Sequence, residues 1–90
     1  MPQYIIERDV PGASNLSGLE LREISVKSCV VIRELGEGIK WIHSYVAGNK
    51  IYCVYEAESE EIIRKSSEMA GLPVTTITLI NNIISPATAE

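Results

Sequence analysis

The chain has 90 residues, of which 46% are hydrophobic and 22% charged, and it carries a formal net charge of −4. A chain this short builds one hydrophobic core, which excludes two domains, and the composition is that of a folded globular protein. The acidic balance, with lysines and arginines in runs no longer than two, argues against nucleic acid as a partner.

No segment approaches the roughly 20 apolar residues of a membrane span. The first residues, "MPQYIIERD", also lack the basic and then apolar pattern of a secretion signal. We therefore expect a soluble cytoplasmic protein.

The first strand is predicted at residues 4–9, "YIIERD", and ends before Pro11 and Gly12. Ser17 and Glu20 then have the spacing of a helix-capping box. Apolar residues recur at helical spacing after it, which predicts a helix over residues 18–35 with Gly36 as its C′ residue. These apolar residues are Leu21, Ile24, Val31, Ile32 and Leu35, with Ser28 filling the intermediate turn.

Two strands, residues 39–46 and 50–57, are predicted to form a hairpin around Gly48 and Asn49. In that register Val46 faces Ile51, and the alternation sorts the hairpin into two faces. The face expected to pack on helices carries Ile42, Ser44, Val46, Ile51, Cys53 and Tyr55. The opposite face is expected to carry Trp41, His43, Tyr45, Tyr52, Val54 and Glu56.

Ser59 and the two acidic residues after it predict the start of a second helix, residues 60–70, which ends at Gly71 before Pro73. A last strand is expected at residues 74–80, and residues 81–90 form a tail without periodicity. Residues 2–80 would then make up the single domain.

The order strand, helix, strand, strand, helix, strand is that of the ferredoxin-like α+β fold, a four-stranded antiparallel sheet with two helices on one face. The other face would expose an apolar patch too large to leave in water, formed by Trp41, Tyr45, Tyr52 and Val54. We therefore expect a homodimer packed through that face. Ile42, Val46, Ile51, Cys53, Ile24, Val31 and Ile62 should be buried on the helix side, and Cys29 is also expected to be buried.

Four segments together resemble a family of small bacterial βαββαβ proteins, most of unknown function, that includes a dimeric nickel-binding protein. They are "ERDVPG", "IKWIHSY", "CVYEAESEEIIRK" and "AGLPVTTI", and the resemblance covers about residues 2–80. It implies a ferredoxin-like fold, a dimer and a divalent-metal site. This chain has Ser66 where family members often carry a histidine in the second helix, and its hairpin is shorter.

His43, the only histidine, is a candidate metal ligand together with Glu56 and Glu7. His43 and Glu56 share the open sheet face in the predicted register, and Glu7 joins them if the first strand turns Ile6 toward the helices. One imidazole and two carboxylates make a plausible site for a divalent ion, and the resemblance implies nickel. The alternative is a histidine hydrogen-bonded in a dimer interface, with Glu7 paired to Arg8 or Lys40.

The aromatic residues also allow two interpretations. Tyr45 and Tyr52 could offer hydroxyls to a small ligand or could simply stabilise the sheet as a cross-strand pair. Trp41 is interpreted as an interface or pocket-wall anchor, and Cys53 as a core residue rather than a nucleophile.

Three functions remain open from the residues alone. They are a non-catalytic metal-binding protein, a small-ligand-binding or interaction dimer without metal, and a cofactor-free enzyme with His43 as general base. No glycine-rich phosphate loop, Ser-His-Asp set or Cys-x-x-Cys pair is present. The sequence therefore favours binding over catalysis.

Overall fold

A computed structural model describes all 90 residues and gives six main elements. They are β1 (Gln3–Asp9), α1 (Gly18–Leu35), β2 (Ile39–Ala47), β3 (Lys50–Ala57), α2 (Glu60–Ala70) and β4 (Thr76–Leu79). Three short 3₁₀ turns lie at Ala13–Asn15, Gly36–Gly38 and Pro86–Ala89. The predicted element order is confirmed, and β4 is shorter than the predicted strand at residues 74–80.

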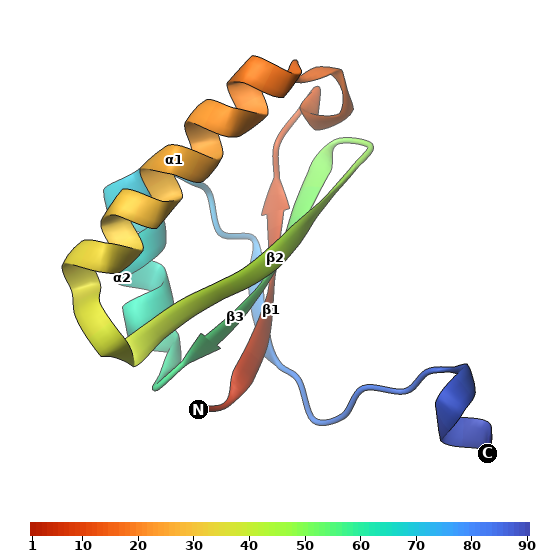
Figure 1. Cartoon of the computed structure of the whole chain (residues 1–90). Coiled ribbons are helices and arrows are strands. Elements are labelled where there is room, and N and C mark those ends of the chain that lie inside the picture. Colours follow the sequence, from red (N-terminus) through yellow and green to blue (C-terminus); the bar gives the residue numbers. More distant parts are fainter.

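The four strands form one sheet in the order β2-β3-β1-β4, and every neighbouring pair is antiparallel. Both helices lie on the same side of this sheet (Figure 1). This is the predicted ferredoxin-like arrangement. None of the helices is both long and apolar enough to cross a bilayer.

Helix α1 begins with the predicted capping box. The Glu20 backbone N–H donates to Ser17 Oγ at 3.1 Å, and the Ser17 backbone N–H donates to Glu20 Oε1 at 3.1 Å. Two of the backbone donors at the helix start are thereby satisfied. Gly36 follows the helix with a φ of 84°, a conformation that a residue with a side chain adopts only with strain.

Helix α2 begins differently from the prediction. Ser59 occupies the N-cap position, but its side chain makes no capping hydrogen bond. The acidic residues of the first turn, Glu60 and Glu61, still lie where they stabilise the positive end of the helix dipole. At the other end Gly71 has a left-handed backbone, as expected for a helix-ending glycine.

The core lies between the sheet and the two helices. Eight buried side chains form it, and the sheet provides six of them: Ile6 from β1, Ile39 from β2, and Ile51, Cys53, Tyr55 and Ala57 from β3. Ile63 of α2 and Ala13 complete the cluster. Alternate residues of β3 are therefore buried, which is the period of a strand with one covered face.

Strand β2 contains a β-bulge that the sequence did not reveal. Trp41 pairs with Tyr55 and His43 with Val54, which leaves Ile42 as an extra, unpaired residue. An extra residue in a strand moves the side chains of all preceding residues to the opposite face of the sheet from the one that regular alternation predicts. The prediction that Trp41 lies on the open face is therefore wrong, since Trp41 packs against the core on the helix side.

The burial predicted for the helix side is confirmed only in part. Ile51, Cys53 and Val31 are buried, and Ile24 and Ile62 are half-buried. Ile42 is 37% exposed because it sits at the bulge, and Val46 is 41% exposed on the edge strand. Cys29, also expected to be buried, lies on an exposed face of α1, and both cysteines are free.

The tail, residues 81–90, leads away from the sheet (Figure 1). All of its residues are exposed, including Ile83 at 70% and Ile84 at 78%. The last backbone hydrogen bond to the folded domain is made just before the tail, where the Ile80 N–H donates to the Gln3 carbonyl at 2.8 Å.

Candidate functional site

The sheet face turned away from the helices, called here the open face, carries the predicted site residues other than Trp41. Strand pairing sorts its side chains into rows across the sheet. One row holds His43, Val54, Ile5 and Thr78, and the next holds Tyr45, Tyr52, Glu7 and Thr76. Lys40, Glu56 and Gln3 form a row on the other side of His43.

The three candidate ligands therefore share a face without converging in one chain. Glu56 lies one row from His43, on the neighbouring strand, whereas Glu7 lies one row away in the opposite direction. Glu7 is also two strands from His43, a spacing of roughly 10 Å. No three histidine, cysteine, aspartate or glutamate side chains in the chain lie close enough together to hold a metal ion.

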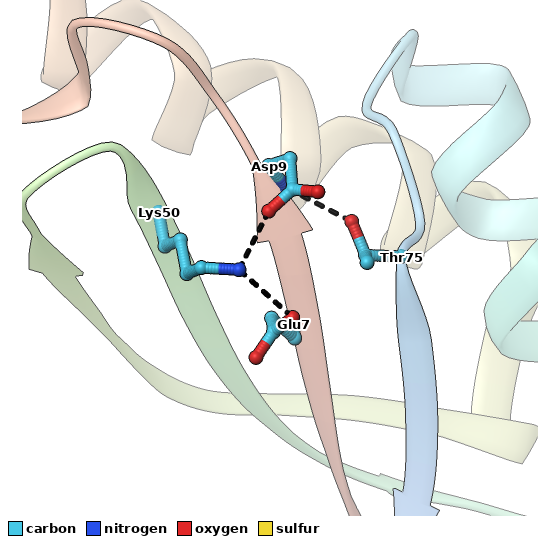
Figure 2. A network of polar contacts seen from close by, with 4 residues as sticks. All are labelled: Glu7, Asp9, Lys50 and Thr75. Atoms are coloured by element: carbon cyan, nitrogen blue, oxygen red, sulfur yellow. Dashed lines mark hydrogen bonds and ion pairs between the residues drawn. The ribbon is translucent and has the colours of Figure 1, made fainter.

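Glu7 forms an ion pair with Lys50, a residue that the sequence did not identify as part of the site. Lys50 Nζ lies 3.0 Å from Glu7 Oε2 and 2.7 Å from Asp9 Oδ1, and thus bridges two carboxylates on β1 (Figure 2). The backbone N–H of Asp9 donates to Thr75 Oγ1 at 3.0 Å, which ties this group to the segment before β4. The partner predicted for Glu7 was Arg8 or Lys40, and Lys50 takes that place.

The bridge shifts the pKa values of Asp9 and Lys50. The hydrogen bond from Lys50 lowers the pKa of Asp9 below its usual range. In return, hydrogen bonds to Asp9 first and Glu7 second raise the pKa of Lys50. Asp9 and Lys50 are therefore both charged at neutral pH. Any cation that binds Glu7 must compete with Lys50.

The other two candidate ligands are less constrained. The exposed His43 ring stacks edge-on against Tyr45, with ring centroids 5.1 Å apart and planes at 78°. Glu56 is half-buried and accepts a long hydrogen bond of 3.4 Å from Gln3 Nε2. Neither residue has an ion-pair partner in the chain, so both are available to an incoming group.

Tyrosines make much of the open face apolar. Tyr45 is 58% exposed and Ile5 is 36% exposed, while Tyr52 and Val54 between them are half-buried. The expected apolar patch therefore exists, with Ile5 in the place of Trp41.

Ser66 does not belong to this face. It is 3% exposed and lies on the buried side of α2, beside Ile63 and Ser67. A serine at this position consequently removes no potential ligand from the open face.

The donor set has the chemistry of a divalent-metal site but not, within one chain, its geometry. One imidazole and two carboxylates suit a borderline ion such as nickel. A complete site on this face would need ligands from a second chain, because the ligands of one chain lie too far apart.

Residues 4–80 match the sequence profile of a family described as "nickel responsive protein SCO4226-like". The chain belongs to this family. The fold agrees with it, since the crystal structure of SCO4226 from Streptomyces coelicolor A3(2) superposes with a TM-score of 0.74. That match covers 91% of this chain and 99% of SCO4226, at 20% sequence identity, and it therefore bears on fold rather than on function. Comparison with proteins of curated function gives no match.

Within the SCO4226-like fold of this chain, sequence reasoning missed Lys50 as a member of the site. The signal that could have found it is strand order. Once β1 is placed beside β3, antiparallel pairing sets Asp9 opposite Lys50 and Glu7 opposite Tyr52. Both carboxylates then flank the lysine on the same face.

Proposed function

We propose that this SCO4226-like protein binds nickel, or another divalent metal ion, as a homodimer that associates through the open face. The observation that carries the proposal is that His43, Glu7 and Glu56 share the only sheet face that the helices leave bare. The family's description as nickel-responsive supports the choice of metal. The protein would be a binding protein rather than an enzyme.

A second chain supplies what one chain lacks. Two copies related by a twofold axis would present two imidazoles and four carboxylates along one interface, enough to complete a site. The apolar residues Tyr45, Tyr52, Val54 and Ile5 would provide the buried contact area.

Titration calorimetry of metal-stripped protein, made without a histidine tag, tests the metal. Nickel, zinc and cobalt should be compared on wild type and on His43→Ala and Glu56→Gln. Both variants should bind at least about tenfold more weakly, as loss of one ligand predicts. Glu60→Gln, an exposed residue of α2 away from the open face, is the matched control and should bind as wild type does.

Lys50 permits a sharper test of the role of Glu7. Lys50→Met removes the cation that occupies Glu7, so metal affinity should rise if Glu7 is a ligand. Binding should also weaken in acid, because a protonated imidazole cannot coordinate a metal ion. Wild-type affinity no better than millimolar, or His43→Ala binding equal to wild type, would reject the site.

The oligomeric state is tested separately by sedimentation velocity without metal. Tyr45→Asp places a charge on the most exposed residue of the apolar patch and should shift a dimer toward the monomer. Val30→Asp, an exposed change on α1, is the control and should leave association unchanged. A monomeric wild type at high micromolar concentration would contradict the dimer.

An apolar small ligand or a protein partner on the same patch, without metal, is the second candidate function. Tyr45 favours it because it is the most exposed large hydrophobic residue of the open face. A dimer that binds no metal in the calorimetric titration would favour this reading.

A further inference from the structure

Arg8 is the one charged side chain buried completely in this protein. It lies on β1 two residues after Ile6, so its side chain points to the helix side of the sheet, and its exposed fraction is 0%. Charged residues are almost never buried so deeply without a partner of opposite charge.

The guanidinium makes three hydrogen bonds, all to neutral groups. Nε donates to Cys53 Sγ at 3.4 Å, and Nη1 donates to Ser67 Oγ at 3.0 Å and to the Pro73 carbonyl at 2.9 Å. The remaining nitrogen, Nη2, is buried without any hydrogen-bond partner, and no other side-chain nitrogen or oxygen is in this situation. One of the three guanidinium nitrogens therefore lacks an acceptor.

The charge of Arg8 is likewise uncompensated. The chain contains ion pairs only at Lys50, so no carboxylate lies within 4.0 Å of the guanidinium. Arginine stays protonated in proteins, so this charge cannot be relieved by loss of a proton. The carbonyl end of α2, where Ser67 lies, offers at most about half a negative charge. An anion would supply the rest.

Arg8 lines a cavity of about 60 Å³ between α1 and the sheet. Its wall is mainly apolar and includes Ile24 of α1 and Trp41 of β2. Val46, near the hairpin turn, also lines the cavity and is 41% exposed.

Two hydroxyl groups in the same wall could assist an anion. Ser44 Oγ accepts a hydrogen bond from Trp41 Nε1 at 2.9 Å, which leaves the Ser44 proton free to donate. Burial raises the pKa of Tyr55, so its hydroxyl keeps its proton at neutral pH. The cavity thus combines an apolar body with a polar end of positive charge.

We propose that this cavity binds a small carboxylic acid in its ionised form, with the carboxylate on the Arg8 guanidinium and a short apolar body against Trp41 and Ile24. A carboxylate matches the planar donor fork of arginine and can accept from Nη2. The apolar wall disfavours a fully hydrated anion such as phosphate or chloride, which would leave its remaining charge without donors. This site lies on the opposite side of the sheet from the proposed metal site and does not depend on it.

Trp41, the only tryptophan, makes binding directly observable through its fluorescence. Metal-free protein is titrated with 3-methylbutanoate and with benzoate, against sodium chloride at equal ionic strength. A saturable change with a dissociation constant of about 1 mM or tighter is expected. The neutral 3-methylbutanamide, which has the same shape, should bind about ten- to a hundredfold more weakly because it lacks the charge.

Two variants test whether the ligand binds in this cavity. Arg8→Met removes the charge at similar volume, an exchange that buried sites often tolerate, and it should weaken binding about tenfold or more. Ser28→Leu leaves Arg8 in place but fills the cavity from α1, and it should abolish the fluorescence change. Arg64→Met, an exposed arginine of α2, is the matched control and should bind as wild type does.

Three results would overturn the proposal. They are no saturable change up to about 20 mM carboxylate, equal affinity for the amide, or an equal response to chloride. If Arg8→Met does not fold, Ser28→Leu still decides, because wild-type affinity in that folded variant places the ligand elsewhere.

Discussion

At the scale of single residues, Lys50 has the best-defined electrostatic role. It bridges Glu7 and Asp9, which would otherwise repel each other from adjacent positions on the same face of β1 (Figure 2). Because Lys50 lies on β3, the bridge also ties β1 to β3 beside the hairpin turn. The group is partly exposed to solvent, so its contribution to stability should be modest and sensitive to salt.

The pKa shifts predict how stability depends on pH. The folded pKa of Asp9 is lowered, so its contribution is present above the unfolded pKa of about 4 and is lost as pH falls through the folded value. The folded pKa of Lys50 is raised, so its contribution is complete below about pH 10 and is lost as pH rises further. Asp9→Asn should therefore lower the urea midpoint at pH 7, and by less at pH 3 or in high salt.

Urea unfolding at the two pH values and at two salt concentrations measures this dependence. Glu34→Gln, which changes an exposed residue of α1 without an ion pair, should cause no loss at either pH. A difference between Asp9→Asn and wild type that stays constant from pH 7 to pH 3 would contradict the assigned role.

At the scale of elements, the two helices begin in different ways although both have a serine N-cap. Ser17 takes part in a reciprocal pair of hydrogen bonds with Glu20, whereas the Ser59 side chain makes no such bond. Their contributions to stability should differ accordingly.

Ser17→Ala should lower the free energy of unfolding by about 0.5–2 kcal/mol, the usual cost of losing a cap. Ser59→Ala should change it by less than about 0.5 kcal/mol, since no hydrogen bond is lost. Urea unfolding of both variants makes the comparison, with each serving as the other's control. Equal losses would show that Ser59 caps α2 in solution.

Local signals in the sequence predicted most of the fold. The capping box, Gly36 and Gly71 place the helix ends where the structure has them, and Gly48 with Asn49 gives the hairpin turn. The bulge at Ile42 has no such local signal. Regular alternation of side chains from the turn therefore predicts the wrong face for the residues before the bulge. One extra residue was enough to place Trp41 on the wrong face.

The candidate site could be predicted less fully because it depends on contacts between distant segments. Alternation in β1 gave the correct face for Glu7, but the pairing of Lys50 with Glu7 and Asp9 follows only from the register between β1 and β3. The same alternation, with Ile6 turned inward, implies that Arg8 is also turned inward. Its burial was therefore readable from the sequence, although its missing counter-ion was not.

At the scale of the whole molecule, the sheet separates two chemically different sides. The open face carries acidic and basic side chains and the exposed Tyr45, whereas the helix side holds the core and the cavity at Arg8. The tail belongs to neither side, since residues 81–90 are all exposed.

Deletion of residues 81–90 should therefore change the free energy of unfolding by less than about 0.5 kcal/mol, because no buried contact is lost. Urea unfolding at low protein concentration measures this, and Ile63→Ala, which truncates a fully buried core residue, is the positive control and should cost about 2–5 kcal/mol. A loss above about 1 kcal/mol on deletion would show that Ile83 and Ile84 dock on the folded domain.

The bulge in β2 also decides how other sequences should be compared with this one. Ile42 separates two halves of β2, residues 39–41 and residues 43–47. Within each half the side chains alternate regularly between the two faces of the sheet, but the alternation shifts by one residue at the bulge. A relative without the bulge is one residue shorter inside the strand rather than in the loop. Placing the alignment gap at Gly48 and Asn49 instead would exchange inward and outward positions for residues 43–47, including His43.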